Sequence, residues 1–116
     1  MEKIRLEILL FDLLNLGRVN IVELVKDGDM YSLYENYGDR ESSDLINHWV
    51  ESHNNLEVAL ARFEGLVAAL QMIGYRLPSN GEELQLPGYR TSYAEKQQLL
   101  ENLAIHTNPG HRLLDV

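Results

Sequence analysis

The chain has 116 residues, of which 45% are hydrophobic and 24% are charged, and it contains no cysteine. This length suits one domain with one hydrophobic core, and the composition argues against a disordered chain. The lack of cysteine excludes disulfides, zinc–thiolate sites and iron–sulfur clusters. A net charge of −8 disfavours direct binding to nucleic-acid phosphates or to an anionic membrane surface.

Residues 2–16 are predicted to form a helix, because helix-favouring residues predominate and Gly17 follows them at a capping position. Apolar residues cover more than one face, so this helix is expected at the centre of the core or in a homodimer interface. Asp12 and Asn15 interrupt its apolar stretch, which is shorter than the roughly 20 residues that span a membrane. The N-terminus lacks the basic region and cleavage site of a secretory signal, so a soluble, cytoplasmic protein is expected.

Two interpretations are open for residues 18–38. The β-branched residues and the Asp27-Gly28 pair favour a β-hairpin at about 19–37. Strict alternation is missing, however, and Asn20 and Gly28 fit the cap positions of a short helix. We favour two short helices and keep the hairpin as the alternative.

Two further helices are expected in the middle of the chain. Ser42 or Ser43 can cap a short one that begins at Asp44 and ends around His53. The clearer one covers about 56–73, can be capped by Asn54 or Asn55, and has apolar residues at helical spacing. These apolar residues are Leu56, Leu60, Phe63, Val67 and Leu70. The second helix is expected to pack on the helix at 2–16.

The last third of the chain contains a long loop and a final helix. Pro78 and Pro87 would break a helix, so residues 74–91 are predicted to be a loop. The sequence Ser92-Tyr93-Ala94-Glu95 fits a capping box that opens a helix ending near His106, and residues 111–116 form a tail. The chain is thus predicted to be a single all-α domain, residues 1–116, of four to six helices. The alternative is an α+β domain with the small hairpin described above.

The motifs of common enzymes are missing from this sequence. Its glycines are isolated and build no phosphate-binding loop, and its serines fit helix caps better than nucleophiles. His48 and Glu51 are three residues apart, which does not match a chelating pair. We therefore expect no catalytic residues, no metal site and no cofactor.

The negative charge is concentrated in one segment. Residues 23–57 contain nine acidic and two basic side chains, a net charge of −7. The same segment holds three tyrosines spaced by three, which would form a stripe on a helix, and the single tryptophan. The candidate protein-binding residues, called here the acidic-aromatic surface, are Asp29, Tyr31, Tyr34, Glu35, Tyr37, Asp39, Glu41, Asp44 and Trp49.

Aromatic side chains serve as interface anchors, and carboxylates attract a basic partner. The sequence therefore predicts a non-enzymatic protein that binds and regulates or inhibits another macromolecule, a protein with a basic surface. An alternative, by analogy of size and charge, is a phage-type anti-restriction or anti-CRISPR inhibitor that mimics nucleic acid. A merely solvated acidic face would explain the same pattern.

A different class of function is suggested by the tripeptide Gly-Tyr-Arg, which occurs at 74–76 and again at 88–90. Two arginines can bind an anion in a bidentate manner, and two tyrosines can stack on a ring. The chain would then be a binding module for a small anionic ligand or a nucleotide. The candidate residues are Tyr75, Arg76, Tyr89 and Arg90.

Overall fold

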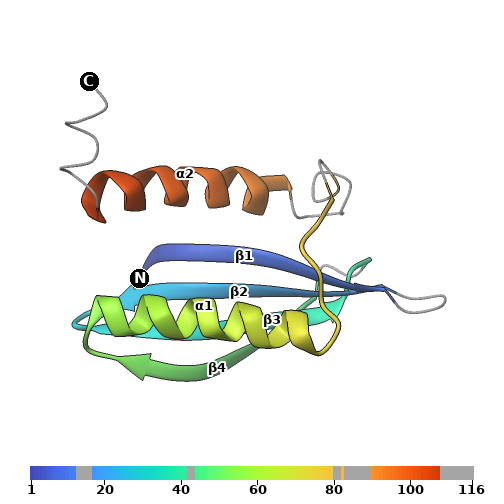
Figure 1. The fold of residues 1–116 in the computed structure, drawn as a ribbon, viewed down its shortest axis with the longest axis horizontal. Helices are drawn as coiled ribbons and strands as arrows, with labels where there is room; N and C mark the ends of the chain where they lie inside the picture. Colours follow the sequence, from blue (N-terminus) through green and yellow to red (C-terminus); the bar gives the residue numbers. More distant parts are fainter. Residues whose placement is uncertain (13–16, 42–43, 80–81, 83–89, 108–116) are drawn as a thin grey trace.

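The computed structural model describes residues 1–12, 17–41, 44–79, 82 and 90–107. Within these residues the chain forms an antiparallel sheet followed by two helices, α1 (Leu56–Met72) and α2 (Arg90–Thr107) (Figure 1). The strands lie side by side in chain order: β1 (Glu2–Asp12), β2 (Gly17–Asp27), β3 (Met30–Asp39) and β4 (Ile46–His53). The predicted all-α domain of four to six helices is therefore wrong, and the fold is α+β.

Strand β1 occupies the segment that was predicted to be the helix at 2–16. Leu9 packs in the cluster beneath α1, whereas Leu6, Ile8 and Leu10 belong to a cluster on the opposite face of the sheet. A strand that is buried on both faces has a continuous apolar run, which resembles that of a buried helix. The proposed homodimer through this helix loses its basis, because these side chains are buried within their own chain.

Strands β2 and β3 form a hairpin, so the favoured pair of short helices is wrong and the alternative is correct. The hairpin is longer than expected and runs over Gly17–Asp39. Asp27 and Met30 are paired across a two-residue turn, and Gly28 has a φ of 63°. Glycine at the first central position with a positive φ is typical of a type II′ hairpin turn.

Strand β4 replaces the short helix that was predicted from Asp44 to His53. It pairs with β3 from Tyr37↔Ile46 to Tyr31↔His53, with a register shift between Leu33 and Tyr34. Ser42 and Ser43, the predicted caps, lie outside the described residues. This segment is extended because it pairs with β3, and the preferences of its own residues do not reveal that pairing.

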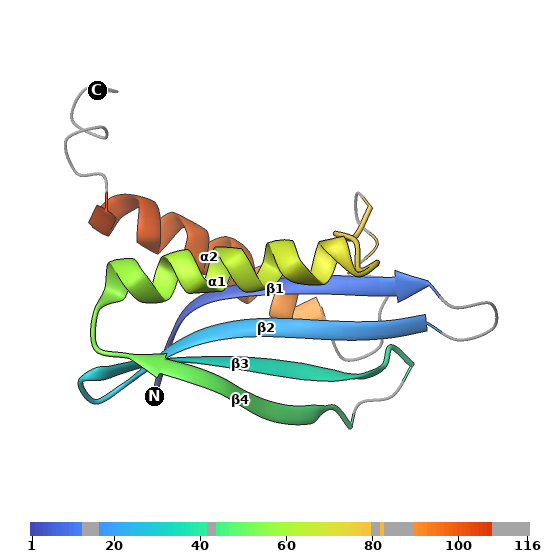
Figure 2. The same cartoon turned by 60° about the horizontal axis from the view of Figure 1, so that its bottom comes forward.

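Helix α1 confirms the prediction at 56–73. Asn55 caps it, because the side-chain oxygen of Asn55 accepts a hydrogen bond from the backbone N–H of Val58 at 3.1 Å. Its buried residues are Ala59, Phe63, Val67 and Leu70, which pack against Leu9, Val22, Leu24 and Leu33 of the sheet. This face of the sheet is called the α1 face below (Figure 2).

Helix α2 confirms the predicted final helix, although it begins at Arg90, before the predicted cap at Ser92. It packs against β1, where Leu99 contacts the cluster on the opposite face of the sheet. Two ion pairs tie the elements together, Lys96–Glu7 at 2.8 Å and Lys3–Glu95 at 2.9 Å. None of the described helices has the length and apolar character that crossing a membrane requires. Residues 111–116 and half of the predicted loop at 74–91 lie outside the described residues.

Candidate functional site

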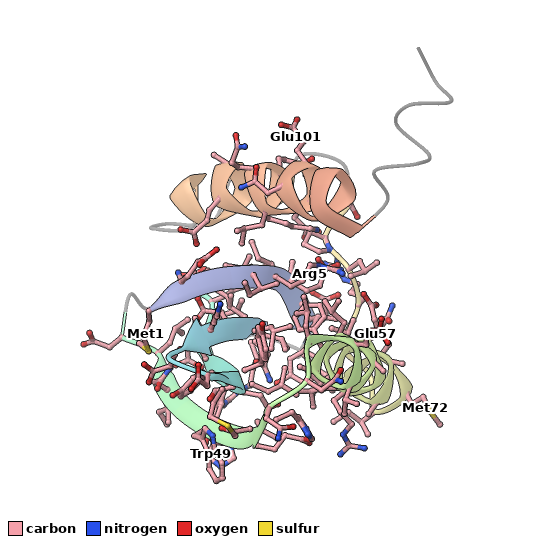
Figure 3. The ribbon with its side chains drawn as sticks, turned by 90° about the vertical axis from the view of Figure 1, so that its left-hand side faces the viewer. Met1, Arg5, Trp49, Glu57, Met72 and Glu101 are labelled. Carbon is pink, nitrogen blue, oxygen red and sulfur yellow. The ribbon has the colours of Figure 1, made fainter. Side chains whose placement is uncertain are left out.

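Strand β4 forms one edge of the sheet and is its most exposed strand. None of its residues, all of which the structure describes, is fully buried. Ile46 and Trp49 are large apolar side chains that are 58% and 54% exposed. Figure 3 shows Trp49 projecting from β4 on the side of the molecule that is remote from α2. No described residue pairs with the outer side of β4, which is called the open edge below.

The three tyrosines of β3 do not form the expected stripe. Side chains of a strand alternate between its two faces. Tyr31 and Tyr37 therefore share the α1 face with Leu33, and Tyr31 packs against the α1 cluster. Tyr34 lies on the opposite face, directly across from Trp49. The structure thus joins Tyr34 with Trp49 and separates both from the other two tyrosines.

A chain of hydroxyl groups positions Trp49 on the opposite face. The indole Nε1 donates a hydrogen bond to Ser52 Oγ at 2.9 Å, and Ser52 Oγ is 2.7 Å from Ser32 Oγ. Ser32 is only 7% exposed, so this contact anchors the exposed indole to the interior of the sheet. The ring of Trp49 is therefore held in a defined orientation while about half of its surface stays accessible.

A second chain of polar side chains crosses the same face. Asn47 Nδ2 donates to Asn36 Oδ1 at 2.6 Å, and Asn36 Nδ2 donates to Glu23 Oε1 at 2.6 Å. Glu23 in turn pairs with Lys3 at 2.8 Å. Glu23 is therefore already neutralised within the chain. Sequence reasoning missed these asparagines and serines, since cross-strand pairs become visible only when the register is known.

On the α1 face, Glu35 is held by neighbours on two strands. Asn20 Nδ2 donates to Glu35 Oε1 at 2.9 Å, and His48 Nδ1 lies 3.6 Å from Glu35 Oε2. Asn20 is 3% exposed, and its side-chain oxygen has no hydrogen-bond partner among the described residues. Glu35, one of the predicted binding residues, is thus engaged in a polar cluster within the chain.

Glu51 joins β4 to α1. Its two oxygens accept hydrogen bonds from Arg62 Nε and Nη2 at 3.0 and 2.8 Å, and its Oε2 also contacts His53 Nε2. Arg62 and, to a lesser extent, His53 lower the pKa of Glu51 to about 2. A carboxyl group that stays ionised in this way ties two elements together and is poorly suited to donate a proton near neutral pH.

Besides Glu57 in the first turn of α1, four other carboxylates of the segment are exposed and make no ion pair with any described residue. Asp27 and Asp29 lie at the β2–β3 turn, next to the end of β4 that carries His53. At the other end, Asp39 closes β3 and Glu41 follows it. Negative charge therefore borders both ends of the open edge.

Asp44, also predicted as a binding residue, is exposed just before β4 and has an interaction within the chain. The structure thus places Asp29 near one end of β4 and Asp39, Glu41 and Asp44 near the other, whereas Glu35 lies in the middle of β3. Of the aromatic residues of this surface, only Tyr34 and Trp49 lie directly across from each other on neighbouring strands.

The residues of the alternative ligand site have structural contacts. Tyr75 packs edge-on against Phe11, with ring centroids 5.3 Å apart. Arg76 donates to Asp12 Oδ2 at 2.6 Å and to Glu82 Oε1 at 2.7 Å, and Arg76 lowers the pKa of Glu82 to about 2. These bonds occupy the guanidinium group that was expected to bind an anion. Tyr89 lies outside the described residues, as does the side chain of Arg90, whose backbone begins α2.

Among the described residues, no group of three or more His, Asp or Glu side chains is arranged to hold a metal ion. Comparisons with protein-family models, with curated proteins and with solved structures gave no match. The candidate site therefore depends on the geometry of the open edge alone.

Proposed function

We propose that this protein is a non-enzymatic cytoplasmic regulator that binds a protein partner with a basic surface. The observation that carries this proposal is the half-exposed Trp49 on the open edge, within a segment of net charge −7. The surface consists of Trp49 and Tyr34 at its centre, with exposed carboxylates at either end of β4. Binding there would inhibit or modify the activity of the partner.

The aromatic pair supports this function because its geometry suits an interface anchor. Tryptophan and tyrosine contribute large contact areas at a small cost in side-chain entropy, and they are enriched among the residues that dominate binding energy. Trp49 is already oriented by its bond to Ser52, so little ordering is needed on association.

The distribution of charge supports a basic partner. Glu23, Glu35 and Glu51 are engaged within the chain. The exposed carboxylates at the ends of β4 are the ones that remain to attract positive charge, and such groups raise association rates in a salt-dependent way. A basic nucleic-acid-binding groove of an enzyme would be one such partner, as in the nucleic-acid-mimic alternative.

The test uses a fluorescein-labelled peptide with two lysines or arginines at each end and alternating threonine and valine between them. Fluorescence anisotropy at low salt measures its affinity for the wild type and for two variants. In D39N/E41Q the charge at one end of β4 is removed, and we expect at least about fivefold weaker binding, or roughly 1 kcal/mol. In the matched control E2Q/E101Q two exposed carboxylates remote from β4 are neutralised, and the affinity should stay within about twofold.

Equal losses of affinity in the two variants would show that binding depends only on the net charge of the protein. This result would contradict a site at β4. Trp49→Ala should weaken binding further, because it removes the anchor without altering charge. A peptide of the same pattern with glutamate in place of the basic residues is expected not to bind.

A further inference from the structure

The two edges of the sheet differ in whether their backbone groups are occupied. At the β1 edge, the N–H of Leu10 donates to the Arg76 carbonyl at 2.8 Å, and the N–H of Arg76 donates to the Leu10 carbonyl at 2.7 Å. At the β4 edge no described residue makes such a bridge. In an antiparallel pair, every second residue of the outer strand directs its N–H and C=O groups away from its neighbour. No described residue occupies these outward-facing groups of β4, so within the described part of the chain another strand can reach them.

Proteins usually protect an exposed edge with lysine, proline, a bulge or a very short strand. Strand β4, with the sequence INHWVESH, has eight residues and contains neither lysine nor proline. Its one irregularity lies beside Val50, where the register shifts opposite Leu33 and Tyr34. Residues 46–49 pair regularly with β3, so the irregularity does not interrupt this stretch of the edge.

Charge distinguishes between the possible occupants of this edge. A second copy that paired antiparallel through β4 would bring its Asp27 and Asp29 beside Asp39 and Glu41 of the first copy, at both ends of the joint sheet. Like charges at this proximity oppose association. A strand with basic residues at its ends would instead meet opposite charge at both ends.

We infer that β4 accepts an extended, basic segment of another protein as a fifth strand of the sheet. This inference rests on the proposed function and specifies its mode of recognition. Backbone hydrogen bonds to β4 would supply affinity, as in other cases of strand addition. Side chains at the ends of the segment would pair with the exposed carboxylates. In the middle, a β-branched side chain would pack against the exposed face of Trp49.

The test uses the same labelled peptide in three forms. One form is unmodified, the second carries N-methyl groups on its odd-numbered amides, and the third carries them on its even-numbered amides. N-methylation removes the N–H donor but leaves the charges and side chains in place. An added strand directs only one alternate set of its amides toward β4. We therefore expect one methylated form to lose at least about tenfold in affinity and the other to bind nearly as well as the unmodified peptide.

Each outcome has a distinct meaning. Equal binding of all three forms would overturn strand addition and leave the proposed function standing, because binding would then depend on side chains and charge. Failure of the unmodified peptide to bind would contradict the proposed function itself. Sedimentation of the free protein should show a monomer. A dimer that Asn47→Lys dissociates would show that a second copy occupies the edge and would also overturn the inference.

Discussion

The two edge strands of this sheet are built in opposite ways. In β1 four residues are buried, α2 packs alongside, and the backbone of Arg76 bonds to Leu10. In β4 no residue is fully buried, and the large side chains of Ile46 and Trp49 are exposed by more than half. The same sheet therefore has one edge that contributes to the core and one that contributes little to it.

This difference suggests that the two edges have different roles. The edge at β1 is covered by α2 and by the segment around Arg76, which removes one site for unwanted pairing. No described residue covers β4, which retains such a site within an acidic surrounding that discourages pairing with another copy. We interpret the open edge as a feature that function maintains, and each of the following variants tests the contrast.

The largest contrast should come from matched truncations on the two edges. Leu10→Ala removes a fully buried side chain from β1 and should lower the free energy of unfolding by about 2–5 kcal/mol. Ile46→Ala on β4 should change it by less than about 0.5 kcal/mol, because Ile46 is largely exposed. Urea denaturation monitored by circular dichroism measures both. Similar losses in the two variants would show that β4 is buried in solution.

A second variant disturbs the segment that closes β1. Gly74 has a φ of 121°, and a Cβ atom at this position would lie 2.5 Å from Phe11 Cε2. Gly74→Ala should therefore destabilise the protein by about 2–3 kcal/mol. Gly65→Ala is the matched control, since beyond its chain neighbours and the helix's own backbone no described atom lies within 4 Å of its added Cβ, and helix propensity predicts a gain of about 0.5–1 kcal/mol. A neutral result for Gly74→Ala would mean that this segment is not fixed against β1.

The pH dependence of stability should reveal the ion pairs of Arg76, which hold the segment after α1 against β1. Arg76, aided by the backbone N–H of Ser79, lowers the pKa of Glu82 from 4.5 to about 2. The unfolded state therefore binds more protons between these two values, and the stabilising contribution of Glu82 is lost as the pH falls through this window. Glu82→Gln should be less stable than wild type by about 1–2 kcal/mol at pH 7. The difference, measured by urea denaturation across this pH range, should become small near pH 2.

A small effect on stability is also expected for the proposed anchor. Trp49→Ala should change the free energy of unfolding by less than about 1 kcal/mol, because most of what it loses is an exposed ring and one hydrogen bond to Ser52. The same variant should impair binding of the basic peptide. A large loss of stability would instead assign Trp49 a structural role.

The sequence allowed some elements to be predicted and concealed others, for physical reasons. Helix α1 was predicted because it buries one face, so its apolar residues recur at helical spacing. Strand β1 was not, because both of its faces are apolar and its pattern matches that of a buried helix. Strand β4 was missed because neither of its faces is deeply buried, so it shows no clear alternation. The Asp27-Gly28 pair indicated the hairpin, but missing alternation in β2 obscured it.

The candidate site was predicted only in outline. Charge counting located the acidic segment without any structure, and this segment contains β4, the strand with the open edge. The pairing of Tyr34 with Trp49 depends on the register of β3 and β4, which no local pattern encodes. Likewise, the neutralisation of Glu51 by Arg62 depends on the packing of α1 against β4. The exposed carboxylates could therefore not be distinguished from those engaged in ion pairs.

The contact between Arg76 and β1 also has a consequence for synthesis of the chain on the ribosome. Asp12 and Arg76 are 64 residues apart, so β1 leaves the exit tunnel long before its edge can be closed. For that interval the nascent sheet has two unprotected edges, and a chaperone or a neighbouring nascent chain could pair with either. Arrival of Arg76 ends the interval at one edge only, and the edge that remains is the one with carboxylates at both ends.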